Sequence, residues 1–188
     1  MRKLLIALAV LLGLSSAAWA QFEDLRNAAI VPGGRMLVRF DEAGNVSFTP
    51  DGGARLAEID QRALRELGIR YDDPEQLAQS SGPNAAIIRS SDGSGPPPVE
   101  RGLVRISLFA VTGRDGSPET LLVLENGYDQ ALRYRALMTR GRSNQPTDVC
   151  IVLPRLRGYE HWPYRIDRLD LRGFALVPYG EGTAPVCE

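Results

Sequence analysis

The fold is decided by residues 132–137, which read Leu-Arg-Tyr-Arg-Ala-Leu. Apolar side chains at 132, 134 and 136 alternate with arginines at 133 and 135. Because successive side chains of a β-strand point to opposite faces, this pattern is typical of a strand with one buried and one solvated face. Residues 167–172, Asp-Arg-Leu-Asp-Leu-Arg, repeat the alternation with Leu169 and Leu171 inward. The two stretches predict an antiparallel sheet.

Further strands are predicted on both sides of these stretches. Branched and aromatic residues, which favour strands, gather in segments separated by turn-forming Gly, Asn, Asp and Pro. Residues 121–124, Leu-Leu-Val-Leu, are apolar at every position and indicate a central strand, whereas residues 154–163 are expected to form a loop. Closely spaced strands without helices between them favour an antiparallel β-sandwich. The predicted strands are residues 103–112, 120–125, 131–139, 147–153 and 166–177.

The chain before residue 100 has a different texture. Residues 36–40 and 46–48 predict a hairpin. A helix is expected over residues 50–67, with Pro50 at its first position and Gly68 after its end. Next comes a run of Gly and Ser and then three prolines, the composition of a linker. The expected division is a signal peptide at 1–20, a small α+β region at 21–91, a Pro/Gly linker at 92–100 and a β-sandwich domain at 101–188.

The first twenty residues have the form of a secretory signal peptide. Arg2 and Lys3 precede an apolar run over residues 4–14, which is too short to span a bilayer stably, and small residues follow up to Ala20. Cleavage is expected after Ala20, and no cysteine follows the apolar run to carry a lipid anchor. The sequence thus predicts an exported protein, in the periplasm or secreted, with no transmembrane span after processing.

Two cysteines are present, Cys150 and Cys187. In an oxidising compartment an isolated pair at this separation predicts a disulfide. Such a bridge would tie down the end of the chain, which otherwise frays. The alternative is a redox pair, although the cysteines of redox pairs usually sit close together in sequence.

Four segments in succession, residues 121–128, 132–136, 148–150 and 160–163, are similar to small exported bacterial proteins of unknown function. The resemblance covers about residues 103–178. It implies an immunoglobulin-like domain and carries no activity with it. It therefore bears on the fold and not on the chemistry.

Charge is unevenly distributed along the chain. After removal of residues 1–20, twenty arginines and no lysine remain, as codon bias would produce. Residues 21–100 hold 8 Arg and 13 acidic residues, whereas residues 133–172 hold 9 Arg and 4 acidic residues. This excess indicates a face for an anionic partner such as lipopolysaccharide, a wall polymer or an acidic protein. Alternatively, the arginines are solvated strand residues whose stems cover apolar neighbours. The candidate residues are Arg133, Arg135, Arg168 and Arg172.

A second candidate site lies at residues 158–164, which contain the single His and the one Trp outside the signal. Binding residues concentrate on loops, and aromatic faces stack against sugars or protein anchors. Alternatively, Trp162 plugs one end of the sandwich and His161 hydrogen-bonds locally. Glu160 and His161 are neighbours and should point to opposite faces of an extended segment, so they are not expected to act as an acid–base pair. The candidate binding residues are Tyr159, Glu160, His161, Trp162 and Tyr164.

The sequence contains no catalytic or cofactor motif that we recognise. No Ser or Cys nucleophile has a triad context, and one His is too few for a His-rich metal site. We expect no metal or cofactor, and the compartment and the net negative charge disfavour nucleic acid as a partner. The sequence predicts a non-catalytic binding or scaffolding module in the bacterial periplasm. A binder of a cell-envelope polymer, lipopolysaccharide or peptidoglycan, is the alternative, and an enzyme of unfamiliar type comes third.

Overall fold

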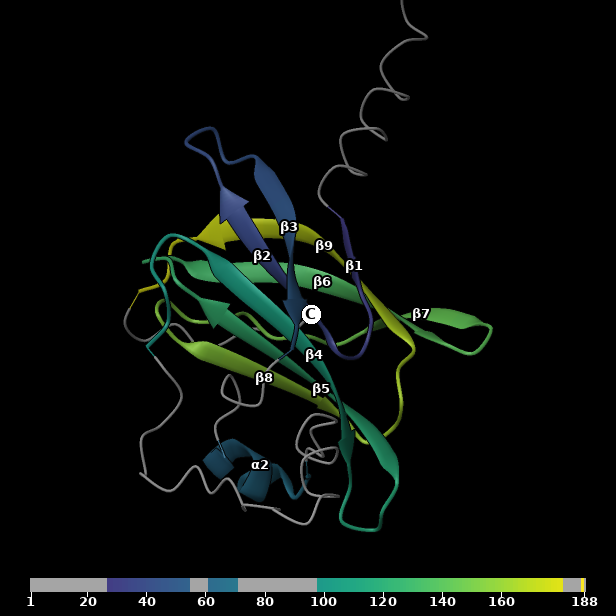
Figure 1. Cartoon of the computed structure of the whole chain (residues 1–188). Helices are drawn as coiled ribbons and strands as arrows, with labels where there is room; N and C mark the ends of the chain where they lie inside the picture. The colour runs from purple at the N-terminus through teal and green to yellow at the C-terminus, as the bar shows by residue number, and fades with distance from the viewer. Residues whose placement is uncertain (1–26, 55–60, 71–97, 181–186, 188) are drawn as a thin grey trace, which may run out of the picture.

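The computed structural model describes residues 27–54, 61–70, 98–180 and 187. Its elements are β1 (Ala28–Ile30), β2 (Gly34–Phe40), β3 (Val46–Gly53), α2 (Gln61–Leu67), β4 (Val104–Thr112), β5 (Pro118–Asn126), β6 (Ala131–Arg140), β7 (Ser143–Thr147), β8 (Arg157–Trp162) and β9 (Arg168–Val177). The strands form two antiparallel sheets that pack face to face (Figure 1). The four-stranded sheet has the order β1-β9-β6-β7 and the five-stranded sheet the order β3-β2-β4-β5-β8. The chain is thus mainly β, with the sandwich-like arrangement that the sequence predicts.

The alternation on β6 is confirmed. Leu132, Tyr134 and Ala136 are buried between the sheets, whereas Arg133 and Arg135 are exposed. On β9 the inward positions 169 and 171 are fully buried. Burying these apolar faces removes them from water, which is the main force that holds the two sheets together.

The alternation on β9 changes phase at Gly173. Leu171 and Phe174 are both buried, although residues three apart in a regular strand face opposite sides. The pairing with β6 shifts at the same place, between Arg133 and Arg135. Gly173 has φ 63°, a conformation that side-chain-bearing residues rarely adopt. The extra residue is a β-bulge, and it returns Phe174 to the core.

The five-stranded sheet is covered on both faces. Leu121 and Val123 point away from the four-stranded sheet and form a second core with Phe109 and with Leu64 of α2. Helix α2 accordingly lies on the side of β5 and β8 that faces away from the four-stranded sheet (Figure 1). A strand buried on both faces needs apolar residues at every position. The central place predicted for residues 121–124 is therefore confirmed.

The predicted hairpin is present as β2 and β3, but the helix expected over residues 50–67 does not begin at Pro50. Strand β3 continues to Gly53, and the described helix is Gln61–Leu67, with Gly68 after it at φ 73°. Proline fits β3 because this strand lies at the edge of its sheet, where a missing N–H breaks no ladder. Proline is also common at the first position of a helix, which is why the sequence predicted a helix that begins at Pro50.

Residues 28–53 belong to the same two sheets as the rest of the chain. Strand β1 pairs with β9, and β2 pairs with β4. The boundary expected at residue 101 therefore does not separate the sandwich from a region of another fold. Residues 1–20 and most of the expected linker, 92–97, lie outside the described residues.

Two expectations for the segment between β6 and β9 are wrong. The strand expected at residues 147–153 is found earlier, as β7, and within residues 148–153 the structure has only isolated bridges. The loop expected over residues 154–163 contains strand β8, which pairs with β5. Pro154 and Pro163 flank this strand. Prolines indicate turns on either side of a segment but do not show that the residues between them form a loop.

Cys150 and Cys187 form the predicted disulfide. The bond joins the segment before β8 to the last described residue of the chain, and bonds of this kind persist in oxidising compartments. No helix in the described part of the chain is long and apolar enough to cross a bilayer.

Candidate functional site

Strand β8 divides the candidate residues of segment 158–164 between two faces. Trp162 points into the main core and is 6% exposed. Its indole Nε1 donates a hydrogen bond to Thr147 Oγ1 at 2.8 Å. Tyr159, by contrast, packs against the second core, on the other side of the sheet. Trp162 thus occupies the position expected if it plugs one end of the sandwich, and it is not presented to a partner.

Glu160 and His161 contact different partners. Glu160 Oε1 accepts a hydrogen bond from the Cys150 amide at 2.7 Å, on the core side of the sheet. His161 Nε2 lies 2.7 Å from Glu119 Oε2, on the opposite side. The two side chains therefore lie on opposite faces of β8, as the alternation predicts, and do not contact a common partner in these hydrogen bonds.

The Glu160 carboxyl is half-buried beside Tyr134. Burial raises the pKa of Glu160 most, the Cys150 amide lowers it, and the charge of Asp148 raises it further. Burial, together with the charge of Glu160, raises the pKa of the Tyr134 hydroxyl well above its usual value. Burial is the largest cause of both shifts, so they make the stability of the fold depend on pH.

The four arginines predicted for an anionic partner lie on one face. The pairing of β6 with β9 places Arg135 opposite Arg172 and Thr139 opposite Arg168, all on the outer side of the four-stranded sheet. Arg133 is exposed on the same side. We call this surface the arginine face (Arg133, Arg135, Arg168 and Arg172). The structure brings together residues that lie up to 39 positions apart in the sequence.

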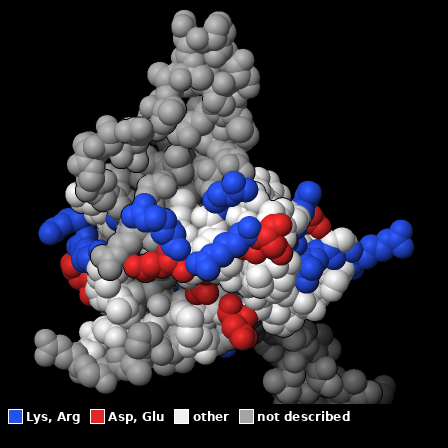
Figure 2. All heavy atoms as spheres, turned by 90° about the horizontal axis from the view of Figure 1, so that it is seen from below, with Lys and Arg blue, Asp and Glu red and all other residues white. Residues whose placement is uncertain are grey.

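The arginine face carries an excess of positive charge. Among the described residues of β6 and β9, one acidic residue shares it: Asp170, which lies opposite Leu137 and accepts a hydrogen bond from Arg168 Nε at 3.0 Å. Four arginines and one aspartate give a net charge of +3. The view from below the sandwich shows basic and acidic side chains next to one another (Figure 2).

The outer side of the five-stranded sheet holds a buried ion cluster that the sequence did not single out. Glu125 is 1% exposed and lies between two arginines, with Arg105 Nη1 at 2.6 Å and Arg157 Nη2 at 2.7 Å. Glu125 follows the apolar run of β5, so its burial follows from that run, and its partners come from the two neighbouring strands, β4 and β8. Pairing with two guanidinium groups offsets part of the cost of burying this carboxylate.

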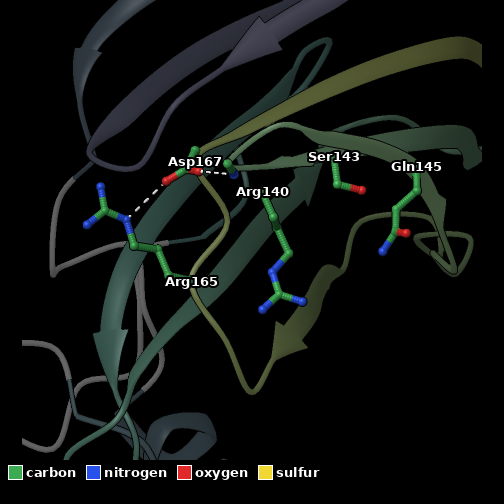
Figure 3. Close-up of a pocket in the computed structure, with 6 residues that line it drawn as sticks. Arg140, Ser143, Gln145, Arg165 and Asp167 are labelled. Carbon is green, nitrogen blue, oxygen red and sulfur yellow. Dashed lines mark hydrogen bonds and ion pairs between the residues drawn. The ribbon is translucent and has the colours of Figure 1, made fainter.

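A depression of about 570 Å³ lies under the hairpin of β6 and β7, which extends beyond the body of the sandwich (Figures 1 and 3). Asp167 organises one side of it, accepting a hydrogen bond from the Gly141 amide at 2.7 Å and pairing with Arg165 Nε at 3.2 Å. The sequence did not indicate this site, because its two halves lie on separate turns. The lining residues are Arg140, Gly141, Ser143, Gln145, Arg165 and Asp167.

Within the described residues, no three His, Cys, Asp or Glu side chains are grouped so that they could hold a metal ion. The two antiparallel sheets are the part of the sequence resemblance that the structure supports. The chain matches no protein-family model, no curated protein and no solved structure.

Proposed function

We propose that the protein is a non-catalytic binding module of the bacterial periplasm, and that its arginine face binds an anionic polymer of the cell envelope. The observation that carries this proposal is the pairing of Arg135 with Arg172 across two strands, on a face with a net charge of +3. Two guanidinium groups held opposite each other on adjacent strands concentrate positive charge on this face. That concentration attracts a partner whose anionic groups are closely spaced.

The geometry favours an extended ligand over a small one. The arginines are spread over two adjacent strands of a sheet, and none of them lines the depression beside Asp167. Guanidinium groups bind phosphate and carboxylate with two parallel hydrogen bonds, and a sheet holds them at fixed spacing. A polymer with repeated phosphates, such as lipopolysaccharide, or with repeated carboxylates, such as peptidoglycan, offers several such groups at once.

Location and kinship rest on separate observations. The disulfide supports an oxidising compartment, and the signal peptide predicted at residues 1–20 would deliver the chain there. The immunoglobulin-like relationship of residues 103–178 stays a prediction. It can be tested by comparing the strand order β3-β2-β4-β5-β8 with the strand order of immunoglobulin-like domains. The separation of Glu160 from His161 across β8 supports a role without catalysis.

The test is cosedimentation with lipopolysaccharide aggregates and with purified wall sacculi, using neutral phosphatidylcholine vesicles as the reference. We expect binding to weaken between about 0.05 and 0.5 M salt, because exposed charges are screened. The variant Arg133→Glu plus Arg135→Glu should bind at least about tenfold more weakly. Arg39→Glu plus Arg142→Glu is the matched control, since it changes the net charge equally at exposed arginines off the face.

Three results would contradict the proposal: binding that does not respond to salt, equal loss in both double variants, or equal binding to the neutral vesicles. Binding to an acidic protein but to neither polymer would also contradict it, and would favour the acidic protein that the sequence indicates as another candidate partner. Circular dichroism of each variant controls for folding.

A further inference from the structure

Arg140 is positioned by the ring of Tyr164. Its Cζ atom lies 3.9 Å from the ring centroid, which is the geometry of a cation–π contact. Within the described residues Arg140 makes no ion pair, although it is the last residue of β6 and is exposed. A guanidinium that stacks on a ring through its flat face keeps its N–H groups free in the plane. Those donors remain available to a ligand in the depression.

The other charges around the depression largely cancel. Arg165 is paired with Asp167, so Arg140 leaves the lining with a net charge of +1. The close-up shows the Arg165 guanidinium on the far side of Asp167 from Arg140 (Figure 3). A single uncompensated positive charge in the lining suits a monoanion such as a carboxylate better than a doubly charged phosphate.

The remaining lining side chains are neutral and polar. Ser143 and Gln145 of β7 offer a hydroxyl and an amide, both of which can donate and accept hydrogen bonds. These groups suit the hydroxyls of a ligand. The volume of about 570 Å³ lies within the usual range of small-molecule sites.

We infer that the depression is a binding site for a carboxylate carried on a small hydroxylated ligand, of the class of acidic sugars, with Arg140 as the carboxylate-binding residue. Ser143 and Gln145 receive the hydroxyl groups, and Tyr164 positions Arg140. The site is distinct from the arginine face, because Arg140 follows the inward positions of β6 and the arginine face uses the alternate ones.

The test is a titration of the full-length mature protein with sodium D-glucuronate, followed by amide NMR spectra. We expect saturable shifts at the Gly141 amide, which is bonded to Asp167, and at residues 143–145. D-glucose at equal concentration should cause none, because it lacks the carboxylate. Inorganic phosphate at matched ionic strength should bind more weakly than glucuronate.

Variants distinguish a contact made by two parallel hydrogen bonds between the Arg140 guanidinium and the carboxylate from a general effect of positive charge. Arg140→Gln should weaken glucuronate binding about tenfold or more, since it removes a charge-assisted pair. Arg140→Lys should also weaken it, because an ammonium group has no fork. Tyr164→Leu should weaken it, and Tyr164→Phe should not, because the ring remains. Arg142→Gln, which removes an equal charge from the adjacent turn and does not line the depression, should bind as the wild type does.

The inference is overturned if glucuronate causes no saturable shift, if Arg142→Gln loses as much binding as Arg140→Gln, or if phosphate binds as tightly as glucuronate. Arg133→Glu plus Arg135→Glu should still bind glucuronate. A failure of the polymer-binding proposal would therefore leave this result unchanged, and the reverse also holds.

Discussion

At the scale of single residues, neighbouring side chains of β8 lie on opposite sides of the sheet and have different surroundings. Trp162 enters the core and is held by Thr147, whereas its neighbour His161 meets Glu119. The sequence predicted this separation for Glu160 and His161, since alternation is a local property of extended backbone. The burial of Trp162 could only be weighed as an alternative, because the strands that cover it are distant in the chain.

Trp162→Ala should lower the free energy of unfolding by about 3–5 kcal/mol, because it leaves a cavity in the core and removes the hydrogen bond to Thr147. Urea unfolding followed by circular dichroism measures this. Leu156→Ala is the control: Leu156 is 52% exposed, and its loss should change stability by less than about 0.5 kcal/mol. A Trp162→Ala protein of wild-type stability would show that the indole is not part of the core.

Glu160→Gln should stabilise the protein increasingly as the pH rises from acid to neutral. The pKa of Glu160 is raised in the fold above its ordinary value of 4.5. Burying this carboxyl therefore costs nothing below that value, and the cost grows as the pH rises through the folded pKa. Glutamine keeps the oxygen that accepts the Cys150 amide but has no charge. Melting temperatures of both proteins between about pH 3.5 and 7 measure the difference.

Asp41→Asn provides a control of opposite sign. The side chain and amide of Asn45 hold the pKa of Asp41 below its ordinary value, so the native carboxylate stabilises the loop at neutral pH and loses that contribution in acid. The melting temperature of this variant should be lower than that of the wild type at neutral pH and equal to it in acid. Parallel pH profiles for the Glu160 and Asp41 variants would contradict both assignments.

At the scale of elements, strands with a local pattern could be predicted and strands held by distant partners could not. The alternating apolar residues of β6 and β9 can be recognised in the sequence, and so can the hairpin of β2 and β3. Strand β7, Ser-Asn-Gln-Pro-Thr, has little strand propensity and is mostly exposed, and it is extended because it pairs with β6. The arginine face could be predicted because it uses strands that can be recognised in this way, whereas the depression depends on β7.

Gly173→Ala should destabilise the protein by about 1–2 kcal/mol, because the bulge requires a left-handed backbone that a Cβ disfavours. An added Cβ would meet nothing within 4 Å, so the effect reports backbone strain and not a clash. Thermal unfolding measures it. Gly180→Ala, also in open space but without a positive φ, should have little effect. Equal stability of the two variants would show that the bulge does not depend on glycine.

At the scale of the whole molecule, the two layers and the disulfide could be predicted, but the order of the strands could not. Composition and spacing indicate how many apolar faces need covering. They do not say which strands become neighbours. Strand β1 lies beside β9, near the other end of the chain, and no local pattern marks such a pairing.

Replacing both Cys150 and Cys187 by Ala should lower the free energy of unfolding by about 4 kcal/mol, the loop entropy expected for the 37-residue separation that the disulfide closes. Chemical denaturation of the variant, compared with wild type in the presence and absence of a reductant, measures this. Reduced wild type should match the variant. A change below about 1 kcal/mol would show that the bond adds little to a tail already held by other contacts.

The position of β1 also sets the order in which the molecule can mature. Ala28 and Ile30 find their neighbours, Leu171 and Leu169, only after more than a hundred further residues have been synthesised. A nascent chain therefore cannot complete its four-stranded layer until its last strand emerges, and pairings over such separations form slowly. Ribosome stalling or truncation before residue 168 would leave β1 without β9, the strand with which it pairs. Such an incomplete sheet exposes apolar surface that proteases and chaperones recognise.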